Sequence, residues 1–378
     1  MSEKRILLAS LLKPINDTRM YEKLGLSLSK LPYTQVHIAG FEAPAPAGIP
    51  SNVQLHPVFS FRRLSISRFT AQRKFLKLLQ SIKPDLIIVC THELLLAAWY
   101  YSRKYKCKLI YDVQENYSLN LTAQDTYHPI LKRVLATGVR SIEQLTASRI
   151  DHFLLAEQSY AQELPFIEDR FTILENKYKP GTNYIKPATP VQVNRDKLKL
   201  LYSGTISSLY GIFEAVRLAE ELHKTNADVT LTIIGYCAHT QTLQKLQQAI
   251  LGKPYITLIG GDKLVPHQAI LQAIATHDIG LLPYQPNPST FRCIPTKLYE
   301  YMAYGLPILM KQNPLWDNLL SEAKAGLSIN FNHHSISSLL LALYENKFYT
   351  SGIPADIFWE QEEGKLVTIV QRLLQQTL

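Results

Sequence analysis

The chain has 378 residues, of which 46% are hydrophobic and 19% charged, so it is long enough for two domains with separate cores and is neither disordered nor fibrous. Its four cysteines lie far apart and match neither a zinc pattern nor a disulfide framework, which predicts a reducing, cytoplasmic location. The first apolar run ends near Ser10 and is too short for a signal-peptide core, and we expect no transmembrane helix.

The formal net charge of +9 is unevenly distributed. Residues 1–190 hold 25 Lys and Arg against 16 Asp and Glu, whereas residues 191–378 hold 15 of each, so the first half carries all of the excess. Seven cations and no acid lie between Phe61 and Pro84. The segment from Arg62 to Lys83 therefore predicts an amphipathic basic helix that docks on an anionic membrane surface, with a solvated helix face as an equal alternative. No nucleic-acid motif accompanies the charge, so we expect no nucleic-acid partner.

Apolar runs typical of strands alternate with helical patterns through the first half of the chain. The expected strands are 6–9, 36–41, 55–59, 85–90, 108–113, 152–156 and 171–174, and the main expected helices are 18–31, 67–82, 94–105 and 129–148. Such alternation with nearly continuous apolar strands predicts a doubly wound, parallel α/β sheet. The dinucleotide fingerprint of dehydrogenases is absent.

The alternation stops in a proline-containing segment, residues 177–196, and then starts again. The expected strands of this half are 199–202, 229–234, 256–259, 279–283 and 307–310, and the expected helices are 212–223, 240–251, 266–276, 295–304 and 359–376. We therefore predict two α/β domains, residues 1–185 and 186–358. In two such sheets facing a central cleft, ligands collect at the carboxyl ends of the strands.

The helix expected at 295–304 is the strongest candidate for a binding element. Pro295 suits the first helical position, and Gly305 suits the left-handed residue that ends a helix. Leu298 and Met302 would form an apolar side, while the opposite face, free to bind, would hold Lys297, Glu300, Tyr301 and Tyr304. A helix start favours anions, so Lys297 predicts a pyrophosphate seat and Glu300 a contact with ribose, although a surface ion pair between them is the alternative.

The run from Pro295 to Met310 resembles the nucleotide-sugar signature of the retaining glycosyltransferases of the GT-B fold, family 4. Other stretches extend the resemblance from Ile6 to Leu374, namely Asn16-Asp17-Thr18-Arg19, Tyr111 to Tyr117, Glu175-Asn176, Tyr202 to Ile206 and Tyr210-Gly211-Ile212. The resemblance implies two Rossmann-like domains. It also implies that the last helix, which follows Phe358-Trp359-Glu360 and covers residues 359–378, packs back on the first domain.

The resemblance also implies the site residues. On the acceptor side they are Asp17, which equally suits a helix cap, together with Gln114 and Glu115. The donor side would use Gly204, Thr205, Arg292, Lys297 and Glu300. No metal and no cofactor are implied beyond a nucleotide diphosphate sugar as co-substrate.

Three positions depart from the family pattern. Gln114 replaces the usual histidine, Tyr210 replaces a basic residue before the glycine of the donor loop, and Arg292 replaces the first of two spaced glutamates. A guanidinium binds phosphate in a bidentate manner, so Arg292 is a substitute source of positive charge at the pyrophosphate.

The resulting hypothesis is a retaining, metal-independent hexosyltransferase that moves sugar from a nucleotide diphosphate to a glycan or lipid-linked acceptor in bacterial surface polysaccharide biosynthesis. We expect it in the cytoplasm, peripherally on the inner face of the membrane. The alternatives are a nucleotide-sugar epimerase of the same fold, and a catalytically degenerate partner subunit.

Overall fold

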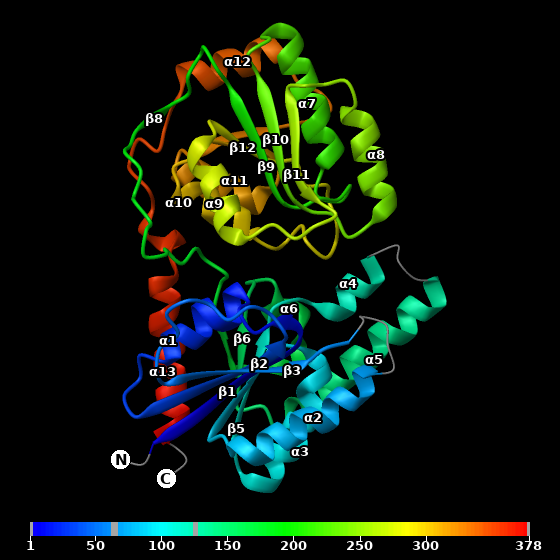
Figure 1. Cartoon of the computed structure of the whole chain (residues 1–378), viewed down its shortest axis with the longest axis vertical. Helices are drawn as coiled ribbons and strands as arrows, with labels where there is room; N and C mark the ends of the chain where they lie inside the picture. The colour runs from blue at the N-terminus through cyan, green and yellow to red at the C-terminus, as the bar shows by residue number, and fades with distance from the viewer. Residues whose placement is uncertain (1–2, 62–66, 124–127, 376–378) are drawn as a thin grey trace. The chain divides into compact units, whose positions relative to one another are not determined.

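The computed structural model describes residues 3–61, 67–123 and 128–375 (Figure 1). Two compact units are present: unit 1 comprises Met1–Lys179 and Trp359–Leu378, and unit 2 comprises Pro180–Phe358. The chain thus passes into unit 2 a few residues before the expected boundary at 185. Arg62 and Arg63, which begin the expected basic helix, and Gln376, at the end of the expected last helix, lie outside the described residues.

Unit 1 is built on a sheet of seven parallel strands in the order β3-β2-β1-β4-β5-β6-β7. The strands are β1 (Lys4–Pro14), β2 (Thr34–Phe41), β3 (Val53–Phe59), β4 (Leu86–Val89), β5 (Lys108–Val113), β6 (His152–Leu155) and β7 (Phe171–Ile173). All seven expected strands are present. From β1 the chain first adds β2 and β3 on one side and then β4 to β7 on the other. The switch point of this doubly wound sheet therefore lies between β1 and β4.

Helices cover both faces of this sheet (Figure 1). One face is covered by η1 (Thr18–Gly25), α1 (Leu26–Leu28) and α13 (Trp359–Gln375), and the other by α2 (Ser67–Ile82), α3 (Leu95–Tyr105) and α5 (Pro129–Ala147). Shorter elements are η2 (His92–Leu94), α4 (Tyr117–Ala123), α6 (Tyr160–Glu163) and η3 (Pro165–Ile167). The uniform helix expected at 18–31 is wrong in detail, because its first eight residues form a π-helix. Helix α4 was not expected, and Asn116 caps it by accepting a hydrogen bond from Leu119 N.

The basic helix α2 has the expected bounds but not the expected free apolar side. Phe75 and Leu79 are fully buried in unit 1, because the helix covers the sheet with its apolar side. Arg73, Lys74 and Lys77 are exposed. Phe75 and Leu79 therefore cannot contact a membrane, whereas the three basic side chains can.

Unit 2 is built on a sheet of six parallel strands in the order β11-β10-β9-β12-β13-β14. The strands are β9 (Lys199–Thr205), β10 (Thr230–Tyr236), β11 (Ile256–Gly261), β12 (Ile279–Leu282), β13 (Ile308–Lys311) and β14 (Gly326–Ile329). Its switch point lies between β9 and β12. A separate antiparallel pair is formed by β8 (Val191–Gln192) and β15 (Lys347–Phe348). Strand β8 lies within residues 177–196, the segment that we interpret from the sequence as the linker between the domains.

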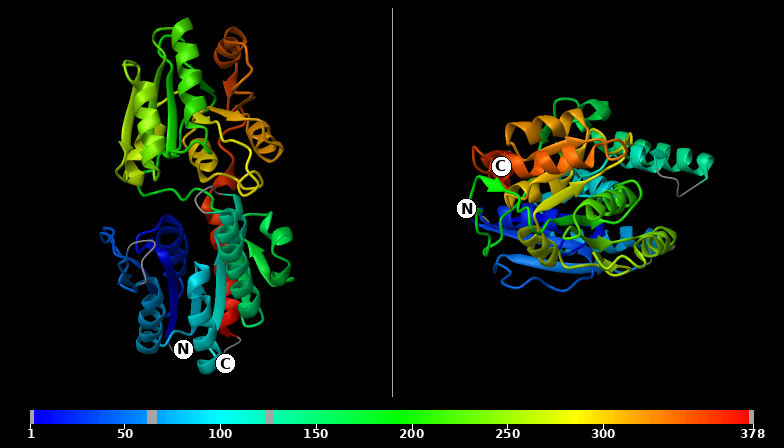
Figure 2. Two further views of the ribbon diagram at one scale, coloured as in Figure 1. Left: turned by 90° about the vertical axis from the view of Figure 1, so that its right-hand side faces the viewer. Right: turned by 90° about the horizontal axis from the view of Figure 1, so that it is seen from above.

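Helices also flank both faces of the second sheet (Figures 1 and 2). They are α7 (Ile212–Thr225), α8 (Thr240–Ile250), α9 (His267–Thr276), α10 (Thr296–Ala303), α11 (Pro314–Glu322), α12 (Ile336–Glu345) and η4 (Ala355–Ile357). Helices α11 and α12 and strand β14 were not expected. The two sheets together confirm the expected fold class, two doubly wound parallel α/β domains of the GT-B type.

The last helix, α13, belongs to unit 1. Trp359, at its start, is 1% exposed, and its indole Nε1 donates a hydrogen bond to Ser27 Oγ at 2.9 Å. Leu366, Val370 and Leu373 continue the buried side of the helix into the core formed by β1, β2 and η1. Across the described residues, no helix has the length and hydropathy that a membrane crossing requires.

We predict that Trp359→Ala destabilises the protein by about 3 to 5 kcal/mol, because it removes a fully buried aromatic side chain and leaves a cavity. Trp359→Phe should cost less, since the ring volume is largely kept. Urea unfolding monitored by circular dichroism measures both variants. Equal stability of Trp359→Ala and wild type would show that α13 does not anchor in the core.

Candidate functional site

The residues singled out from the sequence gather near the carboxyl ends of the strands, in two separate groups, one in each unit. In unit 2 they lie at the end of β9, in the loop before α10 and on α10 itself. In unit 1 they lie after β1 and β5. Both groups are at the edge of a parallel sheet where ligands bind.

Helix α10 has the expected ends, with one correction. Pro295 is the N-cap residue rather than the first helical residue, with an extended ψ of 133°, and its carbonyl accepts the hydrogen bond from Leu298 N. At the other end Gly305 has φ +62°, as expected, and Leu306 N donates to Tyr301 O at 2.9 Å. This arrangement is a Schellman motif, which stops the helix just before β13.

The expectation of one free face on α10 is wrong. Glu300 is 3% exposed and Tyr301 is fully buried, as are their apolar neighbours in the helix. The Tyr301 hydroxyl lies 2.9 Å from Ser203 Oγ on β9. The helix packs on several sides, because it contacts α9 and η4 while Tyr301 contacts Ser203 of β9 and Gly280 of β12. Of the four residues expected on the free face, Lys297 and Tyr304 are half-buried.

Lys297 brings the two donor-side motifs together. Gly204 has φ +107°, and a Cβ built on it would lie 3.0 Å from Lys297 Cε, so the lysine chain rests against a position where only glycine fits well. Lys297 Nζ pairs with Glu300 Oε2, and His267 Nε2 lies 2.9 Å from Glu300 Oε1. Gly204, Lys297, Glu300 and His267 thus form one cluster, which we call the donor cluster.

The charge state of Glu300 is set by this cluster. Burial by itself would raise its pKa, but the positive charge of Lys297 and the hydrogen bonds from His267 and Lys297 outweigh burial and lower the pKa to about 2. Glu300 is consequently ionised throughout the physiological pH range. The ion pair, foreseen as an exposed contact of little energetic value, is instead largely buried.

The remaining donor-side residues lie at the margin of the cluster. Thr205 ends β9 with an exposed side chain, and its carbonyl accepts a hydrogen bond from Tyr202 Oη at 2.9 Å. Arg292 is exposed in the loop before α10. Tyr210, at the position of the family's basic residue, packs against Tyr284 with ring centroids 4.7 Å apart.

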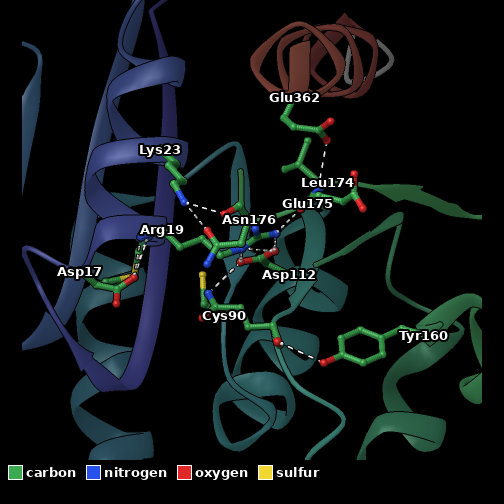
Figure 3. A network of polar contacts seen from close by, with 12 residues as sticks. Asp17, Arg19, Lys23, Cys90, Asp112, Tyr160, Leu174, Glu175, Asn176 and Glu362 are labelled. Carbon is green, nitrogen blue, oxygen red and sulfur yellow. Dashed lines mark hydrogen bonds and ion pairs between the residues drawn. The ribbon is translucent and has the colours of Figure 1, made fainter. Parts of the chain in front are cut away.

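In unit 1, Asp17 caps η1, accepting hydrogen bonds from Arg19 N at 3.0 Å and Met20 N at 2.9 Å (Figure 3). The cap turns Arg19 toward the end of β5, where its guanidinium forms a bidentate pair with Asp112 at 2.7 and 3.0 Å. The same guanidinium donates to Leu174 O at 3.0 Å. Arg19 and Asp112 are both buried, so this ion pair joins the ends of β1, β5 and β7.

The ion pair also orients Gln114. Its amide Nε2 donates to Asp112 Oδ2 at 2.8 Å, which fixes the amide and leaves Oε1 as the group that can accept a further hydrogen bond. Glu115 is held separately, accepting from Asn120 Nδ2 at 3.0 Å. Both side chains are half-buried. The nearby Cys90 is not a candidate nucleophile, since burial raises the pKa of its thiol.

A second set of charges lies beside this pair (Figure 3). Lys23 Nζ donates to the Asn176 side chain, and Glu362 of α13 accepts from Glu175 N at 3.1 Å and pairs with Lys177 at 3.1 Å. The strand end at Glu175-Asn176, singled out from the sequence, is therefore tied to both η1 and α13.

Sequence reasoning missed the roles of Arg19, Asp112 and His267. The first two stand inside quoted motifs, but a buried pair 93 positions apart has no local signature. His267 carried no signal beyond its place at a helix start. Among the residues that the structure describes, no group of His, Cys, Asp and Glu side chains is arranged to hold a metal ion.

We predict that Asp112→Asn destabilises the protein by about 3 to 5 kcal/mol, because it leaves the Arg19 guanidinium buried without a counter-charge. Glu214→Gln, which breaks the half-exposed pair with Arg217, is the control and should cost less than about 1 kcal/mol. Denaturant titrations report both values. The double variant Arg19→Met with Asp112→Leu should recover much of the loss, and equal effects of Asp112→Asn and Glu214→Gln would contradict this account.

Comparisons with known proteins agree with this geometry. Residues 188–351 match the family model described as glycosyl transferases group 1. No curated protein sequence matches the chain significantly. Among solved structures, the chain is similar to sucrose-phosphate synthase from Thermosynechococcus elongatus, with a TM-score of 0.70 and 13% identity over 99% of this chain and 100% of that one.

Two further structures are similar in fold. The putative UDP-N-acetylglucosamine 2-epimerase from Listeria monocytogenes has a TM-score of 0.64 and 12% identity over 99% of this chain and 98% of that one. The HepE protein of Anabaena, in complex with UDP and glucose, has a TM-score of 0.63 and 12% identity over 98% of each chain. These likenesses concern the fold, whereas the sequence match concerns most of unit 2. Residues 188–351 are therefore similar in sequence to the glycosyl transferases group 1 family, within a chain of GT-B fold.

Proposed function

We propose that this protein is a retaining, metal-independent glycosyltransferase of family 4 that transfers a hexose from a nucleotide diphosphate sugar. The observation that carries the proposal is the donor cluster at the carboxyl edge of the sheet in the group 1 domain, where Lys297 lies against Gly204 and is paired with the ionised Glu300. A cation and an anion one helical turn apart suit the two chemical parts of a nucleoside diphosphate.

In this proposal the diphosphate binds at the start of α10. The start of a helix carries a partial positive charge that attracts anions, and Lys297 and Arg292 add positive charge. Glu300 receives one polar contact on each carboxylate oxygen, and each oxygen has a second lone pair that can accept a ribose hydroxyl. Gly204 and Thr205 offer backbone to the phosphates. The UDP in the HepE complex and the substrate named for the Listeria protein make uracil the first base to test.

Transfer with retention requires stabilisation of positive charge on the sugar and of negative charge on the departing diphosphate. Preorganised cations and helix dipoles can supply the second electrostatically, without a metal ion. In unit 1 we assign Asp17, Gln114 and Glu115 to hydroxyl groups of the sugar or the acceptor. Because the Gln114 amide does not titrate and is held by Asp112, its contribution should not vary with pH.

The acceptor that we propose is a glycan or lipid-linked saccharide of a bacterial surface polysaccharide, with the enzyme on the inner face of the membrane. The excess positive charge in the first half of the chain supports it. The epimerase alternative is favoured by the likeness to the Listeria protein. A catalytically degenerate subunit is favoured by the replacements at Gln114, Tyr210 and Arg292.

We predict that Lys297→Ala, Glu300→Gln and His267→Ala each weaken UDP binding. Hydrogen bonds to charged groups contribute roughly 1.5 to 3 kcal/mol, so the expected loss for Lys297→Ala and Glu300→Gln is about tenfold to a hundredfold. Isothermal titration calorimetry gives the dissociation constants. Gln268→Ala, an exposed position on the same helix as His267, is the control and should leave the affinity unchanged. Unchanged affinity in all three cluster variants would remove this site.

A second prediction separates the three functions by product. Incubation with UDP-hexoses and saccharide acceptors, followed by proton NMR of the anomeric signals, should show a new glycosidic linkage of the donor's own anomeric configuration, also in the presence of EDTA. An epimerase would instead form an isomeric UDP-sugar without acceptor. Binding without any turnover would favour the degenerate subunit.

A further inference from the structure

An unpartnered apolar stripe lies on helix α5 of unit 1. Ile130, Leu131, Val134 and Leu135 are between 38% and 69% exposed. Their spacing places them on one side of the first two turns, because residues three or four apart are neighbours on a helix surface. We call these four residues the α5 stripe.

The rest of α5 shows why the stripe is not buried in unit 1. The inner side of the helix, with Ala136, Val139 and Glu143, is buried against α3 and neighbouring elements. Figures 1 and 2 show that α4 and the start of α5 extend away from the sheet of unit 1. The stripe thus lies on the projecting part of the helix, in contrast to the apolar side of α2, which the core uses.

Basic residues are concentrated in the three helices on this side of the sheet. Helices α2, α3 and α5 pack side by side, and by sequence they hold one acidic residue, Glu143, and nine basic residues: Arg68, Arg73, Lys74, Lys77, Arg103, Lys104, Lys132, Arg133 and Arg140. Glu143 is 2% exposed, accepts a hydrogen bond from Tyr111 and pairs with Arg140. Burial raises its pKa to about 7, so it offsets little of the positive charge near neutral pH.

We propose that unit 1 docks on an anionic lipid bilayer, with the α5 stripe entering the boundary between headgroups and acyl chains and the cations of α2 and α3 lying against the phosphates. A bilayer presents an apolar interior beneath a layer of negative charge, which complements both features of this surface. A second copy of the chain would bring the same positive surface against itself. The inference needs no donor or acceptor and holds or fails independently of the proposed reaction.

The test uses co-sedimentation of the full chain with vesicles of phosphatidylcholine that contain phosphatidylglycerol. Changing all four stripe residues to Gln should lower the partition coefficient at least about tenfold, because buried aliphatic side chains no longer drive insertion. The matched control changes four exposed aliphatic residues of unit 2 to Gln, namely Leu251, Ile259, Leu264 and Leu341, and should bind like wild type. Circular dichroism melts check that both variants are folded.

A charge variant separates attraction from insertion. Arg73, Lys74 and Lys77 are exposed, and changing them to Gln should reduce binding to anionic vesicles by up to about a hundredfold at low ionic strength and much less at high salt. The stripe variant should be impaired at both ionic strengths.

Insertion can be seen directly with Leu131→Trp. Its added fluorescence should shift to the blue on anionic vesicles and be quenched by brominated acyl chains, whereas Leu145→Trp, exposed further along the same helix, should report a shallower position. Binding by the stripe variant equal to that of wild type would overturn the inference. Failure of the wild type to bind anionic vesicles would also overturn it. The same holds if sedimentation shows that the stripe mediates a dimer and the protein does not bind vesicles.

Discussion

All strands of each large sheet run in parallel, and this constraint decides where polar side chains can meet. Parallel strands deliver every strand end to one edge, so residues that follow β1, β5 and β7 become neighbours although they are distant in the chain. Arg19, Asp112 and the Leu174 carbonyl meet in this way. In unit 2 the same rule brings the end of β9 to the start of α10. Because the middle of each strand is apolar, the polar side chains that can bind a ligand lie at these edges.

At both edges a buried carboxylate is held by a cation. Asp112 is paired with Arg19, and Glu300 with Lys297 and His267. Desolvation makes such pairs weak sources of stability, and apolar replacements of both partners are often tolerated. Their value here lies in position. Asp112 orients the Gln114 amide, and the contacts of Glu300 fix an ionised acceptor beside Gly204.

The helix layer over unit 1 serves two surfaces at once. Its inner side closes the core, and this requirement uses the apolar side chains of α2 that a membrane would otherwise contact. The outer side keeps the cations, while the projecting start of α5 keeps apolar residues without a partner. The exposed cations and the exposed apolar residues thus lie on different helices. The sequence pattern of a single helix does not predict this arrangement.

The sequence by itself determined the seven strands of the first sheet, five of the six strands of the second, the left-handed residue Gly305 that ends α10, the bounds of α2 and the uneven charge. These features follow from apolar periodicity and residue type within short stretches of the chain. It also indicated that Lys297 and Glu300 share a helix surface. Only the tertiary structure decided that this surface is buried, that His267 contacts Glu300 and that Arg19 reaches Asp112. It also decided that α2 gives its apolar side to the core. Such contacts depend on how whole helices and strands pack against one another. The residues that share the free energy of packing are far apart in the chain, so no local sequence pattern predicts which of them meet.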